Sequence, residues 1–249
     1  MIQVEVILGD RLRADFALQR EMAQLAAPSY RDASSIMVRE SAKCDRAYLG
    51  RDRNHQLVCF LLTKRSFIQA LGERLPTIFM GLSVASDAHK GFGSIAYMWR
   101  QSLEDTRAWQ RQLGQQVIVW ATTATPSIYF AFMMLDHFEP KLDGSFSDRG
   151  RCIAQALGSH LSGRGIDESA HPFVLKALAT GTEYSEVERE RIARISAQRG
   201  FGLFEQLGID EAQWDRLICF GYLSERIERF LSAAMSSDGS QSSENGTLK

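Results

Sequence analysis

The most informative part of the sequence is GLSVASDAHKGFGSIAYMWR, residues Gly81–Arg100. An apolar run ends in a polar bend with two closely spaced glycines, and an amphipathic segment begins at once. From Gly91 to Leu113 the apolar side chains recur every three or four residues. This period predicts a helix of about six turns with one buried face, and Gly114 is placed to end it. The stretch is therefore a strand, a glycine turn and a long helix.

The flanking segments predict further strands and helices. VEVIL alternates like a strand, and Asp10 is a suitable N-cap for a helix after it. AYLGRDRNHQLVCFLL is typical of a strand pair, PTIFMGLSV and VIVWA are apolar β-rich runs, and Pro126 suits the first turn of a helix. This order predicts a mixed α/β fold with a central sheet flanked by helices.

The second half of the chain gives weaker signals. A loop, a helix and a loop are expected after Pro140, then a late strand in HPFVLKALA. Ser185 and Glu188 form a capping-box pattern, and the segment from Ile209 to Met235 has helical periods. We therefore expect a main domain at 1–160, a mainly helical extension at 161–235 and a disordered polar tail at 236–249.

Composition narrows the classes of function. The formal net charge of −1 offers no global basic field for nucleic acid, so any anion site must be local. The four cysteines show no CxxC pair and suggest reduced thiols in a cytoplasmic protein. No signal-peptide pattern opens the sequence and no apolar run is long enough to span a bilayer, so neither secretion by that route nor a membrane span is expected.

The glycine turn has the chemistry of an anion site. The first amides of a helix lack intrahelical partners and their dipoles point outward together, while glycine lets a phosphate approach closely. His89 and Lys90 add donors and positive charge, so a diphosphate is the natural ligand. The alternative is a tight turn whose glycines only relieve crowding. The sequence does not contain GxxxxGK[ST], and GFGSIA lacks the third glycine of GxGxxG.

These residues resemble the central motif of the GNAT N-acetyltransferases, in which a strand ends in Q/R-x-x-G-x-G/A and a long helix follows. Here the motif reads AHKGFG, from Ala88 to Gly93, with Ala88 where the family prefers Gln or Arg. The preceding strand pair and the following strand and helix also resemble the family, over about Met1 to Phe138. The resemblance implies a mostly antiparallel sheet with helices around it, and a helical extension beyond.

The resemblance also implies acetyl-coenzyme A or another acyl-coenzyme A as co-substrate. Its diphosphate would sit on the amides of the glycine turn, its pantetheine arm would pair with the preceding strand, and an amide near Val84 would meet the oxyanion. The implied cofactor-binding residues are Leu82, Val84, Ala85, Ala88, His89, Lys90, Gly91, Phe92, Gly93 and Ser94.

Direct acyl transfer to an amine needs a proton for the departing thiolate and, beyond water, a base. Tyr129 is the candidate general acid because the family often carries a tyrosine in that helix, with Tyr97 as a substitute; a core position is the alternative for Tyr129. Asp87 and Glu40 are candidate bases, although Asp87 is also placed to cap a helix and Glu40 to face solvent. Histidines without HxxxH or HExxH spacing predict no metal site.

The first hypothesis is an acyl-coenzyme A dependent N-acyltransferase, most simply an acetyltransferase, acting on a small-molecule or peptide amine. The alternatives are a catalytically idle module that binds acyl-coenzyme A or a protein, an enzyme like the N-acyl amino acid synthases that uses long acyl chains, and a nucleotide-binding protein. The charged helical extension is a candidate lid over the acceptor site, or a dimer surface.

Overall fold

The computed structural model describes residues 2–90, 92–162, 171–177 and 183–240. Within these ranges eight strands form one sheet in the order β1, β2, β3, β4, β5, β8, β6, with β7 paired to β8. All the pairs are antiparallel except β4 with β5. The strands are β1 (Gln3–Leu8), β2 (Arg46–Arg51), β3 (Leu57–Ala70), β4 (Glu73–Ala85), β5 (Ile118–Thr123), β6 (Asp136–Glu139), β7 (Val174–Leu175) and β8 (Arg216–Tyr222). The fold is mixed α/β with a mostly antiparallel sheet, as predicted.

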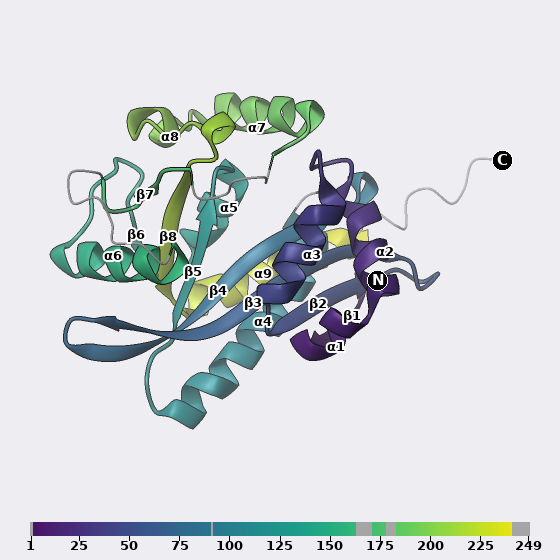
Figure 1. The fold of residues 1–249 in the computed structure, drawn as a ribbon, viewed down its shortest axis with the longest axis horizontal. Helices are drawn as coiled ribbons and strands as arrows, with labels where there is room; N and C mark the ends of the chain where they lie inside the picture. Colours follow the sequence, from purple (N-terminus) through teal and green to yellow (C-terminus); the bar gives the residue numbers. More distant parts are fainter. Residues whose placement is uncertain (1, 91, 163–170, 178–182, 241–249) are drawn as a thin grey trace.

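Helices flank the sheet, as Figure 1 shows. Leu61 and Leu62 are neighbours on β3 and so point to opposite faces. Leu62 packs in a core with the helices α1 to α3, whereas Leu61 packs in the main core with α4 and α9. The helices are α1 (Gly9–Ala14), α2 (Phe16–Ala26), α3 (Ala33–Lys43), α4 (Phe92–Leu113), α5 (Pro126–Phe132), α6 (Asp148–Ser162), α7 (Glu186–Arg199), α8 (Leu203–Gln206) and α9 (Glu225–Ser240).

Most predicted elements of the first half are confirmed. Helix α4 has 22 residues and is followed by Gly114 in the left-handed conformation (φ +63°). Strands β3 and β4 are longer than predicted because they continue into a hairpin that turns at Leu71 and Gly72, both with positive φ. Figure 1 shows this hairpin reaching beyond the rest of the sheet.

The predicted cap of the first helix is wrong. Asp10 lies in the first turn of α1, and Leu8 is the N-cap residue. The chain then breaks at Asp15, whose carboxylate accepts a hydrogen bond from the amide of Leu18 at 2.9 Å and so caps α2. Two short helices stand where one was expected, because Asp15 competes for the backbone donors in mid-segment.

The prediction of continuous helix from Ile209 to Met235 is also wrong. Residues Arg216–Tyr222 form β8, which pairs with β5 on one side and with β6 on the other, and all seven are buried. The region 161–235 therefore supplies a central strand as well as the helices α7, α8 and α9. Helix α9 continues through Ser240, and the remaining residues of the predicted tail, 241–249, lie outside the described ranges.

The described helices differ in length and in apolar character. None of those in the ranges above combines the length and the apolar character that a transmembrane helix needs.

Candidate functional site

The central feature of the site is an opening between β4 and β5. The two parallel strands pair only at Thr77–Phe79 with Ile118–Trp120, although both continue beyond this ladder. Residues Gly81–Ala85 of β4 and Ala121–Thr123 of β5 instead line a cavity of about 790 Å³. The backbone groups of β4 that face this opening have no β5 partner there, so they are available to a ligand that runs along the strand.

A bulge in β4 accompanies this divergence. Thr63 of β3 pairs with Met80 and Leu61 pairs with Ser83, so β4 carries one residue more than β3 across this stretch. A bulge bends the strand and increases its twist. Gly81 sits within it, where an added Cβ would lie 3.1 Å from the carbonyl oxygen of Leu62. Glycine therefore permits the close strand contact at the point where β4 leaves β5.

The glycine turn follows directly from this strand. Asp87, Ala88 and His89 form a single 3₁₀ turn, and the Nδ1 of His89 lies 2.8 Å from the Oγ of Ser86. Asp87 and Ala88 are exposed, whereas Lys90 is half-buried and lines the cavity. Thus Lys90 is the residue of the turn that the described structure places on the cavity wall.

The first residues of α4 form the second part of the glycine turn. Phe92 and Gly93 lie in the first turn of α4, and Ser94 is buried with its carbonyl oxygen facing the thiol of Cys59 at 3.7 Å. Gly91 lies outside the described residues. Of the strand residues predicted to bind the pantetheine arm, Leu82, Val84 and Ala85 all line the cavity. The predicted binding residues thus share one strand end and one helix start.

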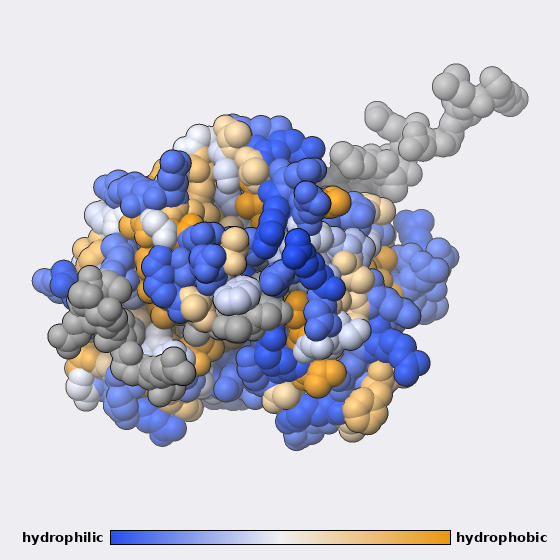
Figure 2. Space-filling view, turned by 45° about the horizontal axis from the view of Figure 1, so that its top comes forward, coloured by the Kyte–Doolittle hydropathy of each residue, from blue (hydrophilic) through white to orange (hydrophobic). Residues whose placement is uncertain are grey.

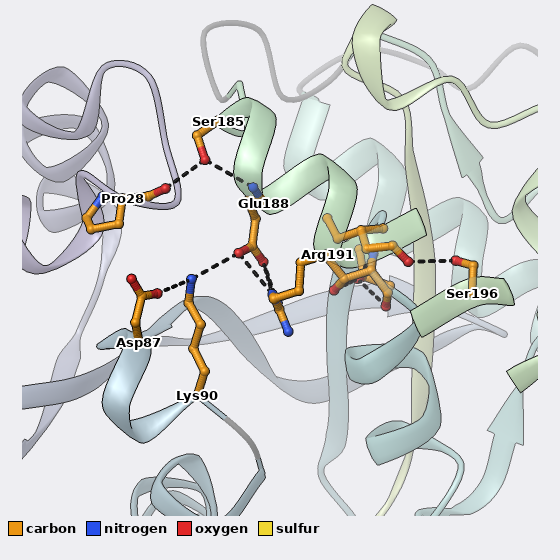
Figure 3. Close-up of polar contacts among 10 residues, drawn as sticks. Pro28, Asp87, Lys90, Ser185, Glu188, Arg191 and Ser196 are labelled. Carbon is orange, nitrogen blue, oxygen red and sulfur yellow. Dashed lines mark hydrogen bonds and ion pairs between the residues drawn. The ribbon is translucent and has the colours of Figure 1, made fainter. Parts of the chain in front are cut away.

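Helix α7 brings a carboxylate to this turn. The Nζ of Lys90 lies 3.3 Å from the Oε2 of Glu188 and 2.6 Å from the Oδ1 of Asp87 (Figure 3). The guanidinium of Arg191 donates to both carboxylate oxygens of Glu188, with its Nε at 3.0 Å from each. The Glu188 side chain is only 6% exposed. Its charge is therefore balanced by two cations rather than by water.

The position of Glu188 is fixed by the chain just before α7. The amide of Ser185 donates to the carbonyl of Ser29 at 2.9 Å, and its hydroxyl donates to the carbonyl of Pro28 at 2.6 Å. The same hydroxyl accepts from the amide of Glu188 at 3.2 Å and so caps α7. Tyr30 and Tyr184 form an isolated antiparallel bridge, with ring centroids 5.2 Å apart. The start of α7 is thus tied to the turn between α2 and α3.

The cavity is basic although the chain is not. Two carboxylates, Glu40 and Glu188, face seven basic side chains among the described lining residues, which are Arg39, Lys43, Lys64, Lys90, Arg191, Arg199 and Arg216. The whole chain has a formal net charge of −1. Figure 2 shows hydrophilic residues over much of one face, with hydrophobic areas between them. Basic walls concentrate field on the cavity and favour an anionic ligand.

Two buried groups on the cavity wall stay protonated at neutral pH. Burial raises the pKa of the Cys44 thiol to about 11. Burial, followed by the neighbouring Tyr184, also raises the pKa of Tyr30. A protonated thiol is a poor nucleophile, so the site does not offer Cys44 as a covalent catalyst.

The structure does not place Tyr129 at the cavity. Its side chain is fully buried, and its hydroxyl donates to the carbonyl of Pro140 at 2.9 Å. Its ring packs against Phe138 and Phe201, and it is not among the residues that line the described cavity. Tyr97, the substitute, is also absent from that lining. The sequence left two alternatives for Tyr129, a catalytic role and a position in the core. The structure places Tyr129 in the core.

The two candidate bases also differ from expectation. The Asp87 side chain is 72% exposed, pairs with Lys90 and is absent from the described lining. Glu40, expected to face solvent, lines the cavity and pairs with Arg39 at 2.9 Å and Lys43 at 3.3 Å. Of the two, Glu40 is the carboxylate in reach of a cavity ligand.

Sequence reasoning missed the part of the site that α7 supplies. The capping-box pattern at Ser185 and Glu188 correctly marked the start of the helix. The carboxylate, however, turns to Lys90 and Arg191 instead of facing solvent. Glu188 is the third residue of a helix with many other charged side chains. Its position in the sequence therefore does not indicate that it is buried. Among the described residues no cluster of three metal-ligating side chains occurs.

Comparison with known proteins gives no family model and no curated protein that matches this chain. Similar solved structures include a probable N-acyltransferase of Enterococcus faecalis V583, with 12% identity, a TM-score of 0.41 and coverage of 56% of this chain. The matched part is 32% of that protein's length, about a third.

GNAT-family N-acetyltransferases are among the other solved structures that this chain resembles. The Escherichia coli GNAT protein YhbS in complex with CoA has 15% identity and a TM-score of 0.39, over 55% of this chain and 68% of that one. A mutant of the AtaT toxin bound to the C-terminus of the antitoxin AtaR and to acetyl-CoA has 15% identity and a TM-score of 0.41, over 60% and 89%.

Proposed function

We propose that this chain is an acyl-coenzyme A dependent N-acyltransferase, which moves an acyl group directly from the thioester to an amine. The observation that carries the proposal is the opening between β4 and β5. It exposes the backbone of Leu82–Ala85 to a basic cavity whose wall includes Lys90 of the glycine turn. An extended chain with a diphosphate at one end matches both parts.

The donor is held by strand and turn together. The diphosphate lies on the free amides at the start of α4, with Lys90 as a cation beside it. The pantetheine arm pairs with β4 along Leu82–Ala85, whose side chains line the cavity. The thioester then reaches the splay, where β4 and β5 no longer pair.

The reaction proceeds without an enzyme-bound intermediate. The neutral amine attacks the thioester carbon, a C–N bond forms, the C–S bond breaks, and the amine proton is transferred so that the thiol is released. An amide of β4 near Val84 stabilises the oxyanion. Glu40, which lines the cavity, is the proposed base in place of Asp87. Tyr129 has no part in this proposal because its hydroxyl is committed to Pro140.

The acceptor is a small-molecule or peptide amine that enters the same cavity. One observation favours the second candidate, a module that binds acyl-coenzyme A without turnover: Asp87 and Tyr129, the two catalytic residues that the sequence predicts, lie off the described cavity lining. The cysteine thiols of Cys44, Cys59, Cys152 and Cys219 fit a reducing compartment such as the cytoplasm.

A melting-temperature screen with coenzyme A, acetyl-coenzyme A, ATP and NAD tests the donor. A ligand at a hundredfold excess over its Kd stabilises the folded state by about 2.7 kcal/mol. We expect coenzyme A and its thioester to raise the melting temperature, and Lys90→Met to weaken both effects. Lys141→Met is the matched control, because Lys141 is exposed and does not line the cavity.

Thiol release in the presence of a panel of amines then separates the two candidates. Release of free thiol above the rate without amine supports the transferase. Binding of the thioester without any release supports the idle module. Protection by ATP or NAD alone contradicts both and indicates a nucleotide site.

A further inference from the structure

The cavity passes through the sheet rather than lying on one face. Leu61 and Leu62 point to opposite faces of β3, and both line it. Ile36 of α3 lines it from one side of the sheet, and Trp99 of α4 lines it from the other. The opening between β4 and β5 is the passage that joins the two sides. A ligand seated in the splay therefore has free space on both faces.

The two ends of this passage differ in chemistry. On the α3 side the lining includes the charged side chains of Arg39, Glu40 and Lys43, and the Lys90–Glu188 pair lies near the turn. On the side of α4, α5 and α9 the lining is mostly apolar, and it includes Met80, Ile95, Trp99, Phe132, Met134 and Phe230.

Three of the side chains at the apolar end are almost fully buried. Met80, Trp99 and Phe132 are at most 3% exposed, and the rings of Trp99 and Phe132 meet edge to face with centroids 5.2 Å apart. These side chains belong to the main core, yet they border open volume. Apolar walls of this kind gain free energy from an apolar occupant and none from a charged one.

We propose that the thioester bound here carries an acyl chain longer than acetyl, whose tail lies in the apolar end. This inference rests on the proposed function. An acetyl group ends at the splay and leaves the walls beyond it without an occupant, whereas a longer tail continues through the opening and covers them. The acceptor amine then approaches from the charged end. The amine and the end of the acyl tail therefore lie on opposite faces of the sheet.

The chemistry of transfer is unchanged by the longer chain. The amine nitrogen bonds to the acyl carbon, the carbon–sulfur bond breaks and the sulfur leaves as the protonated thiol of coenzyme A. No oxidant or reductant is needed. The product is an N-acyl amine with an apolar tail.

Binding of coenzyme A, acetyl-, hexanoyl- and decanoyl-coenzyme A to the full chain, measured by calorimetry and by melting temperature, tests the proposal. Each methylene that becomes buried is expected to lower Kd about fourfold. Met134→Trp and Phe230→Trp fill the apolar end from two different elements and should remove the preference for decanoyl over acetyl. Leu113→Trp is the matched control, because Leu113 lies on α4 outside the lining and is 38% exposed.

The outcomes separate the two proposals. A Kd that falls with chain length in the wild type and in Leu113→Trp, but not in a folded cavity-filling variant, supports the tail pocket. Equal affinity for all four compounds, or the tightest binding by acetyl-coenzyme A, overturns the tail pocket and leaves the proposed function standing. Binding of none of the four overturns the proposed function itself. Circular dichroism of each unliganded variant identifies those that fold, and a single folded filling variant suffices for the test.

Discussion

Replacing Glu188 with glutamine is expected to destabilise the free protein and to strengthen its binding of coenzyme A. The carboxylate oxygen lies 3.3 Å from the Nζ of Lys90, and the side chain is 6% exposed. At that distance, two unit charges attract by about 5 kcal/mol for an effective dielectric constant of about 20. Part of this is offset by the cost of burying the charges.

The net effect on stability follows from what the substitution leaves behind. Removing one partner of a buried pair typically costs about 3–5 kcal/mol, because the remaining charges lack compensation. Lys90 is 20% exposed and Arg191 is 29% exposed, so water compensates them in part. We therefore expect a loss of about 3 kcal/mol, which lowers the melting temperature of a chain of this size by roughly 6–12 °C.

The effect on binding has the opposite sign. In the wild type a ligand diphosphate competes with the buried Glu188 for Lys90, whereas in Glu188→Gln the only carboxylate still paired with Lys90 among the described residues is the exposed Asp87. We expect coenzyme A to bind the variant at least about tenfold more tightly, a difference of about 1.4 kcal/mol. Differential scanning fluorimetry and calorimetry, each with and without coenzyme A, measure the two effects.

Glu190→Gln is the matched control, since Glu190 lies on the same helix and is exposed. It should change neither quantity. An unchanged melting temperature in Glu188→Gln would show that the pair is not stabilising. Weaker binding of coenzyme A by that variant would refute the competition and show instead that Glu188 positions Lys90 for the ligand.

Two further substitutions test the scaffold. Asp215→Asn removes a buried carboxylate. Burial alone would raise its pKa, but the hydrogen bonds from Lys176 and from the amides of Asp210 and Ala177 together outweigh burial and lower the pKa. We expect the free energy of unfolding to fall by about 2 kcal/mol. The difference in unfolding free energy between variant and wild type, measured by urea unfolding, should be fully present above about pH 4. It should shrink as the pH falls through the lowered pKa of Asp215 in the folded state. Gly9→Ala would bring a Cβ within 2.2 Å of the Cys44 carbonyl oxygen and should cost about 1–3 kcal/mol, whereas Gly202→Ala has open space and should not.

Local patterns predicted the elements around the glycine turn. The three-and-four spacing and Gly114 gave both ends of α4, and the compact β-branched run gave β5. β8 was missed for a physical reason. After Arg216 its residues LICFGY show no polar alternation, and a short buried strand cannot be told from a helix by period alone. What fixes it as a strand is its pairing with β5 and β6, which is a property of the fold.

The candidate site also contains residues that local sequence predicts and residues whose positions depend on the packing of the fold. The strand residues Leu82, Val84 and Ala85 and the cation Lys90 were predicted from neighbouring positions in the chain, and they share the cavity wall. The choice of Tyr129 depended on how its helix is rotated, which the packing of Phe138 and Phe201 decides.

Contacts between distant segments were beyond the reach of local patterns. Tyr30 contacts Tyr184, which lies 154 positions later in the sequence. Lys90 contacts Glu188, which lies 98 positions later. Such pairs arise only when the whole sheet is assembled.

The late position of β8 in the sequence has a consequence for biosynthesis. Until residues 216–222 leave the ribosome, β5 has no neighbour along the side that β8 will occupy. The backbone N–H and C=O groups of its residues IVWATT are unpaired along that edge. The nascent chain thus carries an unpaired sheet edge while residues 124–222 are being synthesised. Chaperone dependence should accordingly persist until β8 has emerged, and premature termination before β8 should yield aggregates rather than a smaller folded domain.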